Sequence, residues 1–322
     1  MPIKIRTVRI GLVGAGHMNN TYARCLLHYN KNAELVAIAG GSRTRDFAAE
    51  YGIDAEHDVG ALLSRTDIDA VIIATPHQVL AEHTLAAARK RKHVLVENPM
   101  ATSVADCDAM IEVCREAGVC LGVIKSLRYR GGFSRAHDLL ESGSLGTVEM
   151  IHFMALWSLR GVKGQSWLQE PAAGGQFLAR GSHMFDMLLW LTKQDAVSVA
   201  GRVGSVYGPE WRMESAMSQI GFSGGASAQI WMRHEVPQPD FPESRHRARI
   251  WCEKGLLDCD GFGKLRMAAN GHWEDVWEQP PSGTMPNANR ISTHRSGWRP
   301  TIPRSRTSSM LFERIEPLRL RG

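Results

Sequence analysis

Near its amino terminus the chain reads Val8-Arg9-Ile10-Gly11-Leu12-Val13-Gly14-Ala15-Gly16-His17-Met18-Asn19, followed by the helix-like segment Tyr22-Ala23-Arg24-Cys25-Leu26-Leu27. A run of buried strand formers thus ends in Gly-x-Gly before a helix. The first glycine permits a tight turn, the second lets a ligand approach the backbone, and the helix N-terminus offers N–H groups to phosphate. Asn19 replaces the third glycine of the usual pattern, and the alternative is an ordinary strand-to-helix turn. With a strand before it and a helix after it, this turn predicts a dinucleotide site.

The length and composition indicate a two-domain globular protein. The chain has 322 residues, of which 43% are hydrophobic and 22% charged, and one core seldom extends over such a length. No apolar run approaches the roughly 20 residues of a membrane span. The amino terminus has no apolar signal core, and the six cysteines show no paired metal spacing. We therefore expect a reduced, cytoplasmic protein with no metal site and no membrane association.

The positive charge is concentrated in one segment. The chain carries a formal net charge of +5, but residues 290–322 hold eight arginines, no lysine and only two acids, a net charge of +6. The rest of the chain is therefore nearly neutral. Because nucleic-acid binding requires a basic stripe across a folded face, we do not expect a nucleic-acid partner. A small-molecule substrate is the partner that we expect instead.

The first third of the chain alternates between strand and helix patterns. The strand patterns cover residues 8–13, 35–39, 70–74, 93–96 and 119–124, and the helical ones cover 20–29, 44–51, 58–64, 78–90 and 103–117. Strands without polar alternation, separated by amphipathic helices, predict a parallel sheet covered on both faces. Ligands on such sheets bind beyond the carboxyl ends of the strands. This predicts that Gly14, Ser42, Thr75 and Glu97 lie along one edge.

The pattern changes after residue 124. A helix is expected at 132–142, a strand at 147–157 and a helix near 181–192, followed by strands at 197–206, 216–223, 226–233, 247–253 and 264–268. Gly224-Gly225 predicts a hairpin between two of these strands. The fold class is therefore α/β: a dinucleotide-binding domain at 1–124 and an α+β domain with a large, mostly antiparallel sheet at 125–280. Residues 281–322 are expected to form an irregular Arg-rich tail; a lost reading frame is the alternative.

Several motifs occur together and in order. They are Gly14-Ala15-Gly16-His17-Met18, Ala74-Thr75-Pro76, Lys92-His93-Val94-Leu95-Val96-Glu97-Asn98-Pro99, Arg128-Tyr129, Gly143-x-Leu145-Gly146, Trp167, Gly174-Gly175 and Gly181-x-His183-x-x-Asp186. Through them, residues 8 to about 270 resemble the Gfo/Idh/MocA family of nicotinamide-dependent oxidoreductases. The resemblance implies a Rossmann domain, a substrate between the domains, and homodimers or homotetramers that pair through the open sheet.

The end of the second strand bears on the choice of cofactor. The chain there reads Ala39-Gly40-Gly41-Ser42-Arg43-Thr44-Arg45, with no acid before Asp46. NAD sites usually place an acid there, whereas Ser42 and Arg43 suit a 2′-phosphate. We therefore expect NADP, with NAD as the alternative if Arg43 only stacks on adenine. The expected cofactor-binding residues are Gly14, Gly16, His17, Met18, Ser42, Arg43, Thr75, Pro76, Glu97 and Asn98. Glu97 is expected to contact the ribose or to fix a turn with a cis bond at Pro99.

Oxidation of a secondary alcohol needs a base for the hydroxyl proton and a partner for the developing alkoxide. In the family that the chain resembles, a lysine, an aspartate and a histidine share this work. Here Asn98 stands at the lysine position, Ala179 at the aspartate position, and His183 is retained. Since neither asparagine nor alanine takes a proton at neutral pH, His183 is the expected base, with a near-neutral titration. A buried core histidine is the alternative.

Other residues are expected to compensate or to bind substrate. Lys125, at the end of the fifth strand, is a candidate acid or base if burial lowers its proton affinity; a lysine that reaches solvent is the alternative. Arg180 lies three residues before His183 and suits a carboxylate, or else points outward. Arg128 and Trp167 are expected to contact substrate, although core packing explains Trp167 equally well.

Three functions are compatible with these residues. The leading hypothesis is an NADP-dependent oxidoreductase acting on a cyclic secondary alcohol or ketone, such as a sugar, an inositol or a cis-dihydrodiol. In it, His183 handles the proton and Asn98 positions the oxygen. The second is a glycosidase or lyase that retains NAD and oxidises its substrate transiently. The third is a dinucleotide-binding module without catalysis.

Overall fold

The structure is a computed structural model that describes residues 6–157, 166–175, 177–205, 214–234 and 246–280. The described chain forms two compact units. Unit 1 comprises the residues up to Ile124 together with Glu170–Gly174, and unit 2 comprises Lys125–Gln169 and the described residues from Gly175 onward. The predicted Arg-rich tail, 281–322, lies outside the described residues. Among the described residues, no helix combines the length and apolar character needed to span a bilayer.

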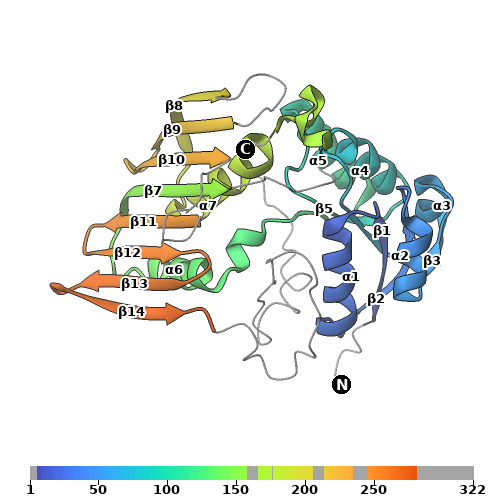
Figure 1. Ribbon diagram of the computed structural model, residues 1–322, viewed down its shortest axis with the longest axis horizontal. Coiled ribbons are helices and arrows are strands. Elements are labelled where there is room, and N and C mark those ends of the chain that lie inside the picture. Colours follow the sequence, from blue (N-terminus) through green and yellow to red (C-terminus); the bar gives the residue numbers. More distant parts are fainter. Residues whose placement is uncertain (1–5, 158–165, 176, 206–213, 235–245, 281–322) are drawn as a thin grey trace. The chain divides into compact units, whose positions relative to one another are not determined.

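Unit 1 is built on a six-stranded parallel sheet. Its strands, in the order β3-β2-β1-β4-β5-β6, are Asp54–Ala55, Ala33–Ala39, Val8–Val13, Ala70–Ile73, His93–Val96 and Leu121–Val123. The helices are α1 (His17–Tyr29), α2 (Thr44–Tyr51), α3 (Val59–Ser64), α4 (Leu80–Arg89) and α5 (Val104–Ala117) (Figure 1). This confirms the predicted doubly covered parallel sheet.

The two faces of this sheet bury separate apolar clusters. On one face, Ile10 and Leu12 pack with Ala23 of α1 and Phe47 of α2. On the other, Val13, Val71 and Ile73 pack with residues of α3, α4 and α5. The strands carry apolar residues on both faces because both are covered, so the sequence shows runs rather than alternation.

Side-chain caps mark the start of two helices of unit 1, whereas α1 has none. The Asp58 side chain accepts a hydrogen bond from the Ala61 N–H at the start of α3, and Ser103 caps α5 in the same way. Helix α1 has no side-chain cap and begins at His17, directly after Gly16. The predicted start at residue 20 was therefore three residues late, because the glycine turn leads into the helix without an intervening loop.

Unit 2 contains an eight-stranded sheet in the order β14-β13-β12-β11-β7-β10-β9-β8 (Figure 1). The strands in chain order are β7 (Val148–Trp157), β8 (Ala196–Ser205), β9 (Glu214–Phe222), β10 (Ser227–His234), β11 (His246–Cys252), β12 (Gly255–Asp260), β13 (Lys264–Ala269) and β14 (His272–Glu278). All neighbours are antiparallel except β7 and β10. The predicted large, mostly antiparallel sheet is confirmed.

Helices α6 (Gly131–Glu141) and α7 (Ser182–Thr192) pack against one face of this sheet. The core between them includes Phe133, Phe153 and Met187, each fully buried. Directly before α7 the chain forms a π-helical turn, Phe177–Gly181. The core therefore fixes α7 and the turn that leads into it.

Two strands of the large sheet were not predicted. Strand β12 carries Asp258 and Asp260 on one face and buries Leu257 and Cys259 on the other, while β14 is an edge strand with mostly exposed residues. The β12 sequence has low strand propensity, and in β14 the strand formers Trp273, Val276 and Trp277 are mixed with three acids. Pairing with neighbouring strands therefore decides the structure of both. The predicted hairpin is confirmed: β9 and β10 pair around Gly225, whose φ is +91°.

Candidate functional site

The glycine turn of unit 1 joins the ends of three strands. Gly14 donates its N–H to the Ala39 carbonyl at 2.7 Å, and the Ala74 N–H donates to the Val13 carbonyl at 3.0 Å. The φ of Gly14 is +100°, and a Cβ at this position would lie 2.7 Å from the Ala74 carbonyl oxygen. Any other residue would clash with this backbone oxygen, so the fold itself requires glycine here.

Gly16 is under a different constraint. Its φ is −88°, and a Cβ added to it would contact nothing closer than the Ala74 carbonyl oxygen at 3.8 Å. The protein leaves room for a larger residue at Gly16, and α1 begins there without a side-chain cap. Exposed His17 and half-buried Met18 form the start of this helix. An uncapped helix N-terminus beside open space fits a phosphate group.

Asn19 performs the packing that a third glycine would otherwise permit. Its fully buried side chain donates hydrogen bonds from Nδ2 to the Val13 carbonyl at 2.8 Å and to the Gly14 carbonyl at 2.5 Å. The amide therefore ties α1 to the end of β1. Nothing in the local sequence pattern signals this role, which depends on how the helix packs against the strand.

Arg43 lies against the same turn from the end of β2. Its guanidinium donates to the Ala15 carbonyl at 2.7 Å. Ser42 and Arg43 are exposed, and Thr44 ties this loop by donating from its hydroxyl to the Gly41 carbonyl at 2.8 Å. The structure thus brings the predicted Arg43 beside the glycine turn, where an arginine can neutralise a phosphate.

Two further predicted cofactor residues, Thr75 and Pro76, follow β4. The Thr75 hydroxyl lies 3.3 Å from Nδ1 of His83, while Pro76 is exposed. A Cβ on Gly14 would lie 3.1 Å from the Thr75 methyl group. Thr75 therefore borders the glycine turn on the side opposite β2.

Glu97 and Asn98 follow β5. One Glu97 oxygen accepts a hydrogen bond from the Tyr22 hydroxyl, and the other accepts from the Asn98 backbone N–H at 2.7 Å. The peptide bond between Asn98 and Pro99 is cis, which confirms that expectation. Burial and the Glu97 carboxylate raise the pKa of Tyr22 well above its usual value. Glu97 thus contacts the residue before Pro99, and ribose binding by Glu97 stays a prediction. The hydrogen bond from Tyr22 was not predicted.

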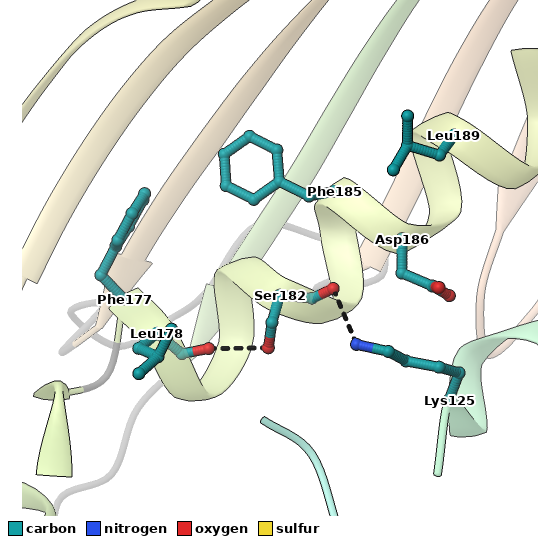
Figure 2. A pocket seen from close by; sticks show the side chains of 7 residues that line it. All are labelled: Lys125, Phe177, Leu178, Ser182, Phe185, Asp186 and Leu189. Atoms are coloured by element: carbon teal, nitrogen blue, oxygen red, sulfur yellow. Dashed lines mark hydrogen bonds between the residues drawn. The ribbon is translucent and has the colours of Figure 1, made fainter. Parts of the chain in front are cut away.

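Unit 2 contains a cavity of about 360 Å³ beside α7. Its lining residues are Lys125, Phe177, Leu178, Ser182, Phe185, Asp186 and Leu189 (Figure 2). The Lys125 ammonium donates to the Ser182 carbonyl at 3.4 Å, and the Ser182 hydroxyl donates to the Leu178 carbonyl at 2.7 Å. Lys125 therefore contacts the start of α7 and borders the cavity.

Asp186, which lines the cavity, forms a bidentate ion pair with Arg128. The Arg128 guanidinium donates to the two Asp186 oxygens at 2.8 and 2.6 Å. The same guanidinium lies 5.5 Å from the centre of the Trp190 ring. Arg128 thus holds the lining carboxylate of Asp186 by both oxygens but does not itself line the cavity.

His183 is the second residue of α7, one turn after Ala179. Its Nδ1 is buried and has no hydrogen-bond partner among the described residues. Burial, together with the positive charges of Lys125 and Arg180, lowers the pKa of His183 to about 3. The expected near-neutral titration is therefore wrong, because removal from water and two nearby cations both disfavour the imidazolium. At neutral pH the imidazole is uncharged.

Of the residues predicted in this unit, Lys125 alone lines the cavity, and Arg128, Trp167, Arg180 and His183 are not among its lining residues. Trp167 is half-buried in a short helix, Ser166–Gln169, and Arg180 is half-buried in the π-helical turn. Neither side chain lines the cavity. Within the described ranges, no three His, Cys, Asp or Glu side chains are grouped closely enough to hold a metal ion.

Two family models match the chain. The model described as "Oxidoreductase family, NAD-binding Rossmann fold" matches residues 8–125, and the "GFO/IDH/MocA C-terminal domain" matches residues 133–258. The first match contains the glycine turn, and the second contains His183 and the α7 residues Ser182, Phe185, Asp186 and Leu189 that line the cavity.

Two proteins of known name illustrate the relationship. A Comamonas testosteroni protein named 1-carboxy-3-chloro-3,4-dihydroxycyclohexa-1,5-diene dehydrogenase is 32% identical over 228 residues, which are 69% of this chain and 57% of that protein. The chain thus spans little more than half of that relative. A 1,5-anhydro-D-fructose reductase from Ensifer adhaerens is 30% identical over 243 residues, 73% of this chain and 71% of the reductase.

A solved structure shows the same fold. The aldose-aldose oxidoreductase from Caulobacter crescentus, complexed with glycerol, superposes with a TM-score of 0.75 and 24% identity. The match covers 85% of this chain and 84% of that one.

The two glycines provide a matched pair for testing the nucleotide site. We expect Gly16→Ala to leave the free energy of unfolding within about 0.5 kcal/mol of the parent, because a Cβ there meets open space. The same change should weaken nicotinamide dinucleotide binding at least about tenfold, measured by calorimetry. Gly14→Ala should instead destabilise the protein in urea unfolding. Equal nucleotide affinity for the parent and Gly16→Ala would contradict this site.

The electrostatic environment of His183 predicts a pH effect. Between pH 6.5 and 3 the unfolded imidazole binds a proton and the folded one does not, so stability falls as pH drops, by up to about 1.4 kcal/mol per unit. Lys125→Met should raise the pKa of His183, measured by NMR titration, and weaken this loss. Lys31→Met, which removes an exposed lysine of unit 1, is the control. If the pKa of His183 is the same in Lys125→Met as in the parent, the Lys125 charge does not lower it, and this prediction is wrong.

Proposed function

The chain belongs to the GFO/IDH/MocA oxidoreductase family, and we propose that it is a nicotinamide-dependent enzyme acting on a secondary alcohol of a ring compound, or on the corresponding ketone. The observation that carries this proposal is the turn at Gly14 and Gly16. There the protein leaves room beside the uncapped start of α1, and the residues present fit a pyrophosphate. The names of the relatives, a dihydroxycyclohexadiene dehydrogenase and an anhydro-fructose reductase, support the class of substrate.

NADP is the cofactor that we propose. The loop after β2 offers Ser42 and Arg43 and no carboxylate before Asp46. An acid at this place would hold the ribose hydroxyls of NAD but repel a 2′-phosphate. Arg43 donates a hydrogen bond to the Ala15 carbonyl, which holds its positive charge close to the glycine turn. We propose that this charge binds the 2′-phosphate of the dinucleotide.

The proposed roles of His183 and Asn98 follow from where the hydride and the proton of the alcohol must go. The nicotinamide, when bound, supplies the hydride acceptor. The alcohol must also lose its hydroxyl proton, and only the neutral form of an imidazole can accept it. His183 is in this form at neutral pH, so we assign it the role of proton acceptor. Asn98, whose amide both donates and accepts hydrogen bonds, positions the substrate oxygen.

Lys125 is assigned to substrate binding rather than to proton transfer. Its ammonium donates to the Ser182 carbonyl and lines the cavity, so it presents positive charge to a ligand there. The same charge, after burial, lowers the pKa of His183, which keeps the imidazole neutral and at the same time makes it a weaker base. Arg128 supports the cavity wall by pairing with Asp186.

We also propose that copies of the chain pair through the open face of the large sheet, and that the protein is cytoplasmic. Met217 and Trp231 are direct cross-strand neighbours there and are 60% and 43% exposed, and Met150 is 42% exposed. Such an apolar surface is typical of a protein interface.

Turnover tests the enzymatic proposal. Purified protein with NADP⁺ and a panel of inositols, sugars and cis-dihydrodiols should form reduced nicotinamide, measured by absorbance. His183→Ala should lower kcat by about 10²-fold or more while nucleotide affinity, measured by calorimetry, stays the same. Nucleotide that co-purifies and is never consumed would support cleavage with a retained cofactor. Binding without turnover on any panel member would support a non-catalytic module.

Arg43→Ala is the matching test of cofactor choice. It should weaken NADP binding about tenfold through the lost phosphate contact and change NAD binding little. Arg45→Ala, which alters an exposed arginine of α2, is the control. An equal loss for NADP and NAD would instead indicate stacking of Arg43 on adenine.

Sedimentation tests the proposed pairing. We expect the parent to be a dimer or tetramer and Trp231→Glu to dissociate it, because a buried unpaired carboxylate is costly in an apolar interface. Leu27→Glu, at a similarly exposed position in α1, should leave the assembly unchanged. A monomeric parent would rule out the pairing.

A further inference from the structure

The wall of the cavity beside α7 is largely apolar. Four of its seven lining residues are Phe177, Leu178, Phe185 and Leu189. The two phenyl rings meet edge to face, with centres 6.2 Å apart and planes at 79°. Figure 2 shows these side chains along the turn and α7, with Lys125 approaching from another segment. Such a wall gains free energy from contact with the face of a carbon ring.

The neutral and acidic polar groups of this wall already have partners within the protein. The Ser182 hydroxyl donates to the Leu178 carbonyl. Both oxygens of Asp186 accept hydrogen bonds from Arg128, so the carboxylate that would suit a sugar hydroxyl is already bound. A polyol must replace the water bonds of each hydroxyl that it buries. The four apolar side chains cannot do this.

The described lining residues include a cation. Asp186 and Arg128 neutralise each other as an ion pair, and Lys125 brings a further positive charge to the cavity, which it lines while donating to the Ser182 carbonyl. Arg180 lies close enough to His183 to act on its charge. A cation beside an apolar wall favours a ligand that carries one anionic group on a carbon ring.

We propose that this cavity binds a ring compound bearing a carboxylate, with the carboxylate against the Lys125 ammonium and the ring against Phe177, Phe185 and Leu189. The substrate is therefore a carboxylated ring alcohol or ketone rather than an uncharged polyol. This inference rests on the proposed function only in taking the cavity to be the substrate site.

Calorimetry with benzoate and benzamide tests the charge requirement directly. The two probes share the ring and nearly the same shape, and only benzoate carries a charge. With the full chain and saturating NADP⁺, we expect benzoate to bind at least about tenfold more tightly than benzamide. Myo-inositol should not displace benzoate. Equal affinities for benzoate and benzamide, or displacement by myo-inositol, would overturn the proposal.

Variants connect the binding to this cavity. Lys125→Met should abolish the preference for benzoate, and Lys125→Arg should largely keep it because the charge is retained. Leu189→Asp, at a position 44% exposed, should repel benzoate by adding a carboxylate without emptying the core. Lys31→Met is the control for loss of one positive charge elsewhere. A benzoate preference unchanged in both Lys125→Met and Leu189→Asp would show that benzoate binds outside this cavity and would overturn the proposal.

The outcomes separate this inference from the proposed function. Turnover of myo-inositol with NADP⁺, without inhibition by benzoate, would support the oxidoreductase and refute the carboxylated substrate. Benzoate binding that depends on Lys125, in a protein that binds neither NADP nor NAD, would support the ligand class and refute the nicotinamide enzyme.

Discussion

The absence of a side chain at Gly14 is the constraint on which the nucleotide site depends. At this residue the end of β1 is hydrogen bonded to the end of β2 and lies against the Ala74 carbonyl that follows β4. Only a residue without Cβ permits this approach at a φ of +100°. The turn directs the chain into α1, and the Asn19 amide then holds that helix against β1. Gly16, Arg43 and Thr75 come together at one edge because these strand ends are fixed.

The second unit shows how burial controls charge. His183 lies in a helix whose other side packs on the core of the large sheet, and its imidazole remains neutral because of burial and the cations Lys125 and Arg180. The carboxylate nearest to the cavity does not offset these cations, because Asp186 is bound by Arg128. The cavity is therefore lined by four apolar side chains, the Lys125 ammonium and a carboxylate that is already paired. The proposed carboxylated ring substrate rests on this lining.

The departures of this chain from the family pattern are accommodated locally. Asn19 replaces a glycine and supplies hydrogen bonds in place of close packing. Asn98 replaces a lysine, and its backbone is held by Glu97, which Tyr22 in turn fixes. These substitutions keep the geometry of the turn after β5 while they remove a proton-carrying group. In the mechanism that we propose, His183 is consequently the one of the three family positions that can still accept a proton.

The sequence by itself determined the parallel sheet, the glycine turn and the hairpin at Gly225, because each follows from local backbone preference and unbroken or alternating hydrophobicity. It could not determine β12, whose residues have low strand propensity, or β14, whose strand formers are mixed with acids, because both are ordered by pairing with their neighbours. It also could not give the pKa of His183, since that value depends on burial and on Lys125, which is 58 positions away in the chain. The pairing of Arg128 with Asp186, and with it the character of the cavity, was likewise decided only when the tertiary structure brought distant residues within hydrogen-bonding distance.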